Sequence, residues 1–80
     1  MKYALVTGST KGIGKAIALR LLSERNDVFV ILNYAHDDAS AKALDEQLDK
    51  ENQGRYAILK ADLSNNIGLK ILLEEVAKIT

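Results

Sequence analysis

One stretch near the N-terminus constrains the fold of this chain more than any other: residues 7–14 read T-G-S-T-K-G-I-G. An apolar run at residues 3–6 leads into it, and apolar residues at helical spacing, Ile13, Ile17 and Leu21, lead out of it. This order predicts a β-strand, a glycine-rich turn and an α-helix. Because a helix N-terminus presents free backbone N–H groups and a partial positive charge, such a turn suits a phosphate group.

The three glycines of this turn are expected to serve separate purposes. Gly8 lets the chain leave the strand in a conformation that a Cβ would strain. Gly12 lets backbone and phosphate come close, and Gly14 lets helix and sheet come close. The spacing excludes a P-loop, because Ala16 stands where that motif needs a hydroxyl residue and Ser9 stands where it needs its first glycine.

Three residues rather than one separate Gly8 from Gly12, which also excludes the G-x-G-x-x-G turn. The remaining pattern, T-G-x-x-x-G-I-G, resembles that of the short-chain dehydrogenase/reductase family, down to Ile13 between the last two glycines. The resemblance covers all 80 residues, but only the first part of the family's fold. It implies a dinucleotide cofactor whose pyrophosphate lies on the turn, at Gly8, Ser9, Thr10, Lys11, Gly12, Ile13 and Gly14.

The apolar segments predict six elements in the order β-α-β-α-β-α. Strands are expected at 2–7, 28–32 and 56–61, and helices at 12–25, at 40–51 and from just after residue 64 to the end. Strands this apolar are typical of a parallel sheet buried on both faces. Right-handed crossovers then give an α/β fold with strand order 3-2-1, half of a doubly wound Rossmann fold. We expect residues 1–80 to be the N-terminal, nucleotide-binding half of such a domain, truncated before the second half.

Capping residues refine these boundaries. Asn26 is expected to end the first helix in a left-handed conformation, and Gly54 to follow the end of the second. Asp37 or Asp38 is expected to cap the start of the second helix, and Ser64 the start of the third. In the second helix the residues expected to face inward are Ala41, Leu44 and Leu48.

The carboxyl end of the third strand carries two further candidates for the cofactor site, because ligands bind at that edge of such sheets. The resemblance implies that Asp62 accepts a hydrogen bond from the adenine amino group and that Leu63 offers backbone contacts. The alternative is that Asp62 only helps to turn the chain into the third helix.

The end of the second strand bears on the choice between NADP and NAD. Asn33 and Tyr34 lie there, and Tyr34 occupies the place where NAD-preferring relatives carry an acid. Lys11 matches a basic position that is common in NADP-preferring relatives and could pair with a 2′-phosphate. We therefore expect NADP, with NAD as the alternative, although Asp37 and Asp38 would repel the phosphate unless they point into the second helix. Lys11 could instead be an ordinary solvated lysine.

The family's catalytic residues, an Asn, a Ser and a Tyr-x-x-x-Lys pair, have no counterpart in this sequence. Tyr56 and Lys60 match Y-x-x-x-K by letter, but they fall on a predicted strand, where such residues lie about 13 Å apart at ~3.3 Å per residue. No catalytic residue is therefore predicted, and whether the chain is itself an enzyme is left open.

Composition narrows the remaining possibilities. The formal net charge is zero, which argues against nucleic-acid binding driven by charge. With no cysteine and a single histidine, His36, no metal site is predicted, and His36 is either a solvated loop residue or one that stacks near the adenosine. The sequence has no apolar run of about 18 residues, and we expect a cytoplasmic protein with no membrane segment.

Two functions of different kinds follow. The resemblance implies that the chain is the N-terminal, cofactor-binding part of a short-chain oxidoreductase, similar to 3-oxoacyl-acyl-carrier-protein reductases, that transfers hydride to or from a carbonyl or alcohol. Alternatively it is a non-catalytic nucleotide-binding or self-associating module, or a truncated product with no function. A homodimer is expected in which the free edges of the first strand pair, or in which the third helix, apolar on more than one face, is covered.

Overall fold

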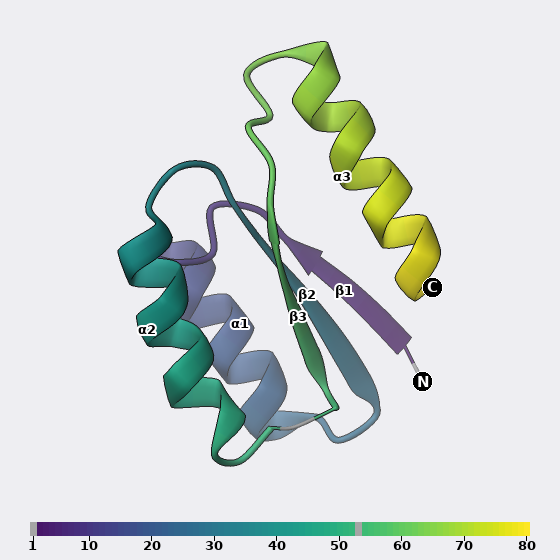
Figure 1. Ribbon diagram of the computed structural model, residues 1–80. Helices are drawn as coiled ribbons and strands as arrows, with labels where there is room; N and C mark the ends of the chain where they lie inside the picture. The colour runs from purple at the N-terminus through teal and green to yellow at the C-terminus, as the bar shows by residue number, and fades with distance from the viewer. Residues whose placement is uncertain (1, 53) are drawn as a thin grey trace.

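The computed structural model describes residues 2–52 and 54–80 and contains the six predicted elements in the predicted order (Figure 1). Their bounds are β1 Lys2–Val6, α1 Gly12–Glu24, β2 Val28–Tyr34, α2 Asp38–Asp49, β3 Tyr56–Lys60 and α3 Asn66–Ile79.

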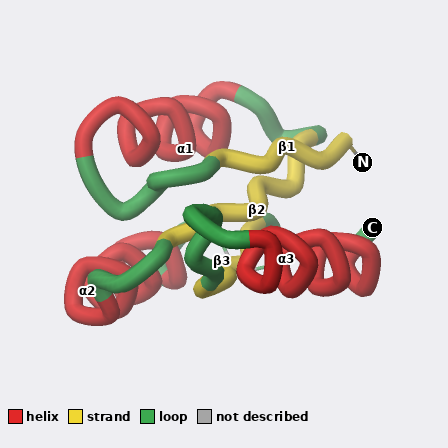
Figure 2. The backbone as a smooth tube through the Cα atoms, turned by 90° about the horizontal axis from the view of Figure 1, so that it is seen from above, coloured by secondary structure: helices red, strands yellow, loops and turns green. Residues whose placement is uncertain are grey.

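The three strands form one parallel sheet in the order β1-β2-β3, which confirms the predicted topology. Lys2 pairs with Val28 across the first junction, and Val30 with Tyr56 across the second. Helices α1 and α2 lie on one face of the sheet, and α3 lies on the other (Figure 2). As in any parallel sheet, the loops that follow the strands all lie at the end of the sheet where the strands finish, which is the upper end in Figure 1.

The core lies around β2, the central strand. Val30, Ile31 and Leu32 are almost wholly buried, as expected for a strand with a neighbour on each side and helices on both faces. Helix α1 contributes Ala18 and Leu22 to this core. Helix α2 contributes the residues predicted to face inward, which are Ala41, Leu44 and Leu48.

Strand β1 is less buried than predicted. Ala4 and Val6 pack against the core, but on the other face Tyr3 is 47% exposed and Leu5 is 45% exposed. The reason is the place of α3, whose main contacts with the sheet are with β3 rather than β1. The prediction that β1 is buried on both faces is therefore wrong for the described part of the chain.

The apolar stripe predicted for α1 is also covered only in part. Ile13 is 80% exposed and Ile17 is about half exposed, whereas Leu21 is half-buried against the core and its neighbours Ala18 and Leu22 are buried within it. Because β1 is an edge strand, the described sheet covers one side of α1 and leaves the other side open.

Two predicted helix ends are corrected by the structure. Arg25, in extended conformation, ends α1, and Asn26 does not adopt a positive φ. Asn65 rather than Ser64 caps α3, because its side chain accepts a hydrogen bond of 2.8 Å from the Gly68 N–H. At α2 the capping residue is Asp37, one of the two that were predicted.

Strand β2 ends at Tyr34 rather than at residue 32 as predicted, because Asn33 and Tyr34 continue the pairing with β3. Asn33 is thus a buried polar residue inside a strand, and its hydrogen bonds explain why that is tolerated. Those hydrogen bonds connect β2 with the turn after β1 and with the end of β3.

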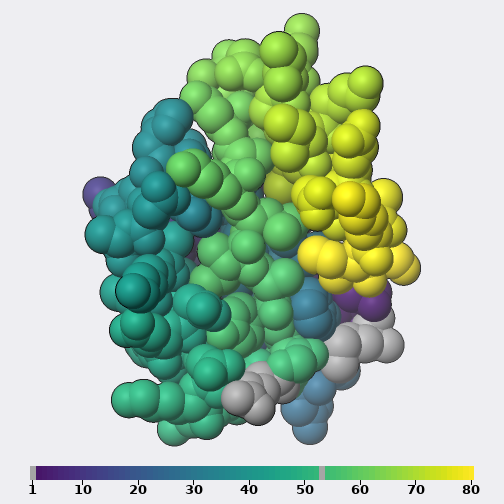
Figure 3. Space-filling view, viewed as in Figure 1, coloured from purple at the N-terminus to yellow at the C-terminus, as the bar shows by residue number. Residues whose placement is uncertain are grey.

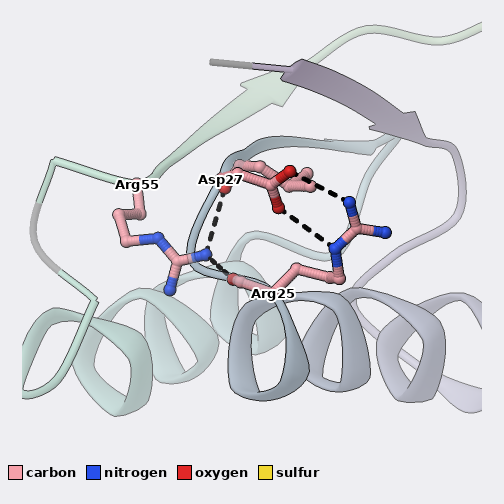
Figure 4. Close-up of polar contacts among 4 residues, drawn as sticks. Arg25, Asp27 and Arg55 are labelled. Atoms are coloured by element: carbon pink, nitrogen blue, oxygen red, sulfur yellow. Dashed lines mark hydrogen bonds and ion pairs between the residues drawn. The ribbon is translucent and has the colours of Figure 1, made fainter.

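Arg55, which lies just before β3, links chain segments at the opposite end of the sheet, where the strands begin (Figure 4). Its guanidinium donates to the carbonyl oxygens of Leu22 (2.9 Å), Arg25 and Val28 (3.2 Å), which lie at the end of α1 and the start of β2. The neighbouring Arg25 side chain instead points to the surface and forms two hydrogen bonds of 3.0 Å with Asp27. Arg55 therefore joins three elements through backbone acceptors alone.

Much of helix α3 is uncovered. Its buried residues are Gly68 and Leu72, and Figure 3 shows much of its length at the surface. The exposed large apolar residues of α3 are Ile67, Leu69, Ile71 and Leu73. No helix within residues 2–52 and 54–80 combines the length and apolar character needed to cross a membrane.

Candidate functional site

The glycine turn between β1 and α1 adopts the conformation that the sequence predicts. Gly8 and Gly12 both have a φ of +59°, which L side chains rarely adopt. A Cβ at either residue would meet no atom within 4 Å, so the space beside both glycines is open. A Cβ at Gly14 would instead collide with the carbonyl oxygen of Gly8 and lie 3.0 Å from that of Thr7. Gly14 thus permits the first turn of α1 to pack on the turn itself.

Two buried polar residues hold this turn in place. The Ser9 N–H and hydroxyl both donate to the Asn33 carbonyl oxygen, over 3.0 and 2.9 Å. The Asn33 side-chain amide reaches the carbonyl oxygens of Leu59 (3.3 Å) and Ala61 (3.2 Å) at the end of β3. Asn33 therefore connects the glycine turn to the end of β3. The side chains of Ser9 and Asn33, both predicted to lie at the cofactor, are engaged inside the protein.

The start of α1 is suited to an anion. The first turn of this helix contains no acidic residue, and its cap, Lys11, makes no side-chain hydrogen bond to the helix. The free N–H groups and the partial positive charge of a helix N-terminus favour a phosphate here. Thr10 is half-buried and Ile13 is exposed beside this end of the helix.

Lys11 is paired with Asp37 across the gap between the glycine turn and the start of α2. The Lys11 Nζ lies 2.8 Å from Asp37 Oδ2. The Asp37 carboxylate also caps α2, accepting from the Ser40 N–H (2.9 Å) and from the Ser40 hydroxyl (2.8 Å). The hydrogen bond from Lys11, and then those from Ser40, hold the pKa of Asp37 well below its usual value. Asp37 is therefore a fixed negative charge at this edge of the sheet.

Asp38, the next residue, has different partners. It accepts a hydrogen bond of 2.8 Å from the Tyr34 hydroxyl, and both its carboxylate oxygens lie 3.1 Å from the Lys60 Nζ. These contacts, with that from Tyr34 the stronger, lower the pKa of Asp38, and the Asp38 carboxylate raises the pKa of Tyr34. Asp37 and Asp38 thus serve two separate ion pairs.

Asp62 and His36 bring together the loops that follow β3 and β2. Asp62 Oδ1 accepts a hydrogen bond of 2.9 Å from the Ser64 N–H, and Oδ2 lies 3.2 Å from His36 Nε2. The hydrogen bonds from Ser64, and more weakly the contact with His36, lower the pKa of the Asp62 carboxyl. Asp62 does help to turn the chain toward α3, and Leu63 beside it is 37% exposed. The adenine contacts predicted for Asp62 and Leu63 stay predictions.

Gly68 supports this loop, a role for which the sequence alone yields no prediction above. A Cβ at Gly68 would overlap the carbonyl oxygen of Asp62 and lie 2.6 Å from its carbonyl carbon. The first turn of α3 can therefore pack on the backbone of Asp62 only because Gly68 has no side chain. A glycine within the first turn of a predicted helix, where alanine would ordinarily be more stable, was the signal in the sequence.

Tyr56 and Lys60 both lie on β3, which confirms that their spacing does not form a helical pair. The Tyr56 hydroxyl donates to Asp45 Oδ1 over 2.6 Å, whereas Lys60 pairs with Asp38. Burial, and then the Asp45 carboxylate, raise the pKa of Tyr56 to about 12. A tyrosine that acts as an acid–base catalyst near neutral pH needs a lowered pKa instead.

These contacts place the predicted site residues at the end of the sheet where the strands finish, at the top of Figure 1: on the loops after β1 and β3, in the first turn of α1 and at the end of β2. The glycine turn offers open backbone at a helix N-terminus, which fits a pyrophosphate. Asp62 and Leu63 lie on the loop that follows β3, to which Asn33 connects the glycine turn. The arrangement therefore fits an elongated anionic ligand that extends from the turn toward the β3 loop.

Comparison with known proteins gives a family match over nearly the whole chain. The family model described as short chain dehydrogenase matches residues 2–80. Glucose 1-dehydrogenase 2 of Bacillus subtilis is 44% identical over 75 residues, which cover 91% of this chain and 27% of that protein. The FabG 3-oxoacyl-acyl-carrier-protein reductase of Staphylococcus aureus is 37% identical over 75 residues, which cover 94% of this chain and 29% of that protein.

A solved structure agrees with these matches. The crystal structure of the KRED1-Pglu enzyme superposes with a TM-score of 0.78 at 26% identity, covering 98% of this chain and 30% of that one. This chain thus spans less than a third of the length of each of these three proteins.

Proposed function

Because the chain belongs to the short-chain dehydrogenase/reductase family, we propose that it binds the adenosine and pyrophosphate portions of a dinucleotide cofactor. The observation that carries this proposal is the open glycine turn at the N-terminus of α1. Backbone N–H groups of the turn and of α1 would hold the pyrophosphate, and Asp62 and Leu63 would hold the adenine. When bound, the nicotinamide supplies hydride-transfer chemistry.

The corresponding activity is oxidoreduction, in which hydride passes between the cofactor and a carbonyl or alcohol. The relatives named as a dehydrogenase and a reductase support this class of reaction. No catalytic residue is assigned within these 80 residues, so the proposed role of the chain is cofactor binding. We expect the cytoplasm as its location.

We propose NADP rather than NAD as the preferred cofactor. Lys11 is 72% exposed at the mouth of the turn, and its ammonium group could pair with a 2′-phosphate. Tyr34 offers no carboxylate to a ribose 2′-hydroxyl, and Asp38 is occupied by Tyr34 and Lys60. NAD stays the alternative, because the Asp37 carboxylate lies against Lys11.

Replacing Gly12 by valine tests cofactor binding. The valine side chain would enter the open space where the pyrophosphate is proposed to lie, so binding of NADPH should weaken by about tenfold or more, the loss of roughly one charge-assisted hydrogen bond. The measurement is equilibrium dialysis of NADPH against the 80-residue chain, with circular dichroism to confirm that each variant is folded.

Gly54→Val is the matched control for this substitution. Gly54 has a φ of +77° and equally open surroundings, so it suffers comparable backbone strain, but it lies in the loop between α2 and β3 at the other edge of the sheet. We expect Gly54→Val to lose stability as Gly12→Val does and to keep its affinity. Equal affinity of both variants and the parent chain would contradict the proposed site.

Self-association is a second proposal, favoured by the open edge of β1. The chain exposes 5169 Å², whereas a monomer of its mass ordinarily exposes about 4,800 Å². Two copies could pair their β1 edges antiparallel about a two-fold axis, which would bring the exposed Tyr3 and Leu5 side chains of each copy to the junction. Strand β1 is only five residues long, so paired edges would give a small interface, and we expect a weak dimer.

Sedimentation velocity over a range of concentrations measures this association. We expect a concentration-dependent dimer that Leu5→Lys abolishes, because the lysine would lie in the middle of the paired edges. Leu73→Lys changes an exposed residue of α3. It should weaken a dimer that forms through α3 and leave a dimer that forms through β1 unchanged. A single monomeric species at all concentrations would rule out both routes.

A further inference from the structure

Asn33, near the end of β2, lies between the two parts of the proposed cofactor site. We propose that Asn33 is a positioning residue: it holds the loop that follows β3 at a fixed place relative to the glycine turn, so that one ligand can reach both. The inference rests on the proposed function and concerns the same site. Asn33 would act through the backbone of its neighbours, and because it carries no charge it would not distinguish NADP from NAD.

Packing does not explain an asparagine at this position. Asn33 is only 2% exposed, and it continues the buried apolar run of Val30, Ile31 and Leu32. Asparagine is depleted in strands, and burying an amide costs free energy unless it is hydrogen-bonded. A buried apolar side chain would avoid that cost. The residue type therefore points to a purpose other than filling the core, and a fully bonded buried polar group is one that fixes its surroundings in a single arrangement.

The hydrogen bonds of Asn33 run to both parts of the site. On the side of the glycine turn, its carbonyl oxygen accepts from the N–H (3.0 Å) and from the hydroxyl (2.9 Å) of Ser9, which is fully buried. On the side of β3, its Nδ2 donates to the carbonyl oxygens of Ala61 (3.2 Å) and Leu59 (3.3 Å). One residue thus holds the chain on both sides of the proposed ligand.

The hydrogen bond to Ala61 bears directly on Asp62. The Ala61 carbonyl belongs to the peptide group that leads into Asp62, and a peptide group is planar. Holding that carbonyl therefore sets the direction in which the chain leaves the sheet and enters the loop. The paired part of β3 ends at Lys60, so the Asn33 amide extends the hold on the chain just beyond it.

The test uses three probes that report on the two parts of the site separately. Inorganic pyrophosphate reports on the glycine turn alone, and ADP reports on both parts. Inosine diphosphate (IDP) carries a carbonyl oxygen in place of the adenine amino group that Asp62 is proposed to bind. Affinities are measured by NMR titration of the 80-residue chain at one pH. We expect the parent chain to bind ADP about 10-fold more tightly than IDP, the effect of one hydrogen bond to a charged group.

Asn33→Leu removes the amide and keeps a side chain of similar size. We expect this variant to favour ADP over IDP by only about twofold, because the Asp62 carboxylate is no longer held where the amino group needs it. Its affinity for pyrophosphate should stay within about twofold of the parent, since Ser9 still binds the backbone carbonyl of residue 33. Asn33→Thr suits a strand, but its hydroxyl is one bond shorter than the amide. It should give the same result, and it serves as the test if the leucine variant does not fold.

Ile31→Val is the matched control. Ile31 lies two residues earlier on the same face of β2 and is 1% exposed, but it contributes no hydrogen bond to either loop through its side chain. The lost methyl group should lower Tm and leave the three affinities in the parental ratio. Thermal unfolding of each variant, followed by circular dichroism, thus separates a loss of stability from a loss of positioning.

Three outcomes would overturn the inference. A preference for ADP over IDP that survives in the folded Asn33 variants would show that the loop needs no support from this residue. Equal weakening of all three probes would mean that Asn33 contributes only to stability. A parent chain that binds none of the probes, or that binds ADP and IDP equally, would refute the proposed function or its adenine contact, and this inference with it.

Discussion

Gly68→Ala is expected to destabilise the chain by about 1–3 kcal/mol, the usual cost of forcing an extra methyl group into a packed site. Helix propensity alone predicts the opposite sign, since alanine is about 1 kcal/mol more favourable than glycine within a helix. The collision of the new Cβ with the Asp62 carbonyl decides the outcome, because the atom that it meets is backbone and cannot turn away. In a domain of 80 residues, whose total stability is roughly 4–12 kcal/mol, this is a large fraction.

The measurement is the thermal midpoint followed by circular dichroism, where a loss of 1 kcal/mol lowers Tm by about 4–8 °C in a domain of this size. Hydrogen exchange at the amides of α3 distinguishes detachment of that helix from global unfolding. Lys70→Ala, an exposed change two residues further along the same helix, is the control and should leave Tm nearly unchanged. A rise in Tm for Gly68→Ala would mean that α3 does not pack on Asp62 as described.

Arg55→Met is the second change expected to have a large effect, at about 2–3 kcal/mol of lost stability. Methionine keeps the length of the apolar stem but removes the donors that reach the carbonyls of Leu22, Arg25 and Val28. The Arg55 Nε is buried without a partner among the described residues, which lowers the net contribution of the side chain. Arg55→Lys should recover only part of the loss, because a lysine cannot span several acceptors with a planar fork.

Denaturant titration, fitted with one m-value for all variants, measures the free energy of unfolding of Arg55→Met and of Arg55→Lys. Arg25→Met is the matched control, since Arg25 lies beside the same site but its guanidinium meets only the exposed Asp27 (Figure 4). Exposed ion pairs contribute little to stability, so this variant should have nearly the same free energy of unfolding as the parent chain. Equal losses at Arg25 and Arg55 would show that the charge of either arginine, and not the backbone acceptors of Arg55, is what stabilises this edge.

Much of the fold could be predicted because it follows from local pattern. The order of elements, the parallel sheet and the inward face of α2 are consequences of apolar spacing within short windows. The positive φ of Gly8 and the close approach at Gly14 follow from the only residue type that permits them.

Apart from the two helix ends, the errors have a common physical cause, which is tertiary placement. Whether Ile17 and Leu5 are covered depends on where α3 and the sheet edge lie, and their own sequence neighbourhoods do not contain that information. Asn33 was placed at the end of a strand because its type is rare within strands, yet hydrogen bonds to residues 24 to 28 positions away satisfy it there. The partners of Lys11 and Arg55 likewise come from distant parts of the chain.

The central position of β2 has a consequence for how the chain reaches this structure. Lys2 pairs with Val28, and Val30 with Tyr56, so both strand junctions join residues 26 positions apart. The entropy lost in closing each crossover is therefore about the same, and chain length favours neither as the first to form. Since no two strands are joined by a short hairpin, every sheet contact must wait for a long closure, which places this small domain among the slower folders of its size. Whichever junction forms first, it includes β2, so the pairing of this strand is a step that both orders of folding share.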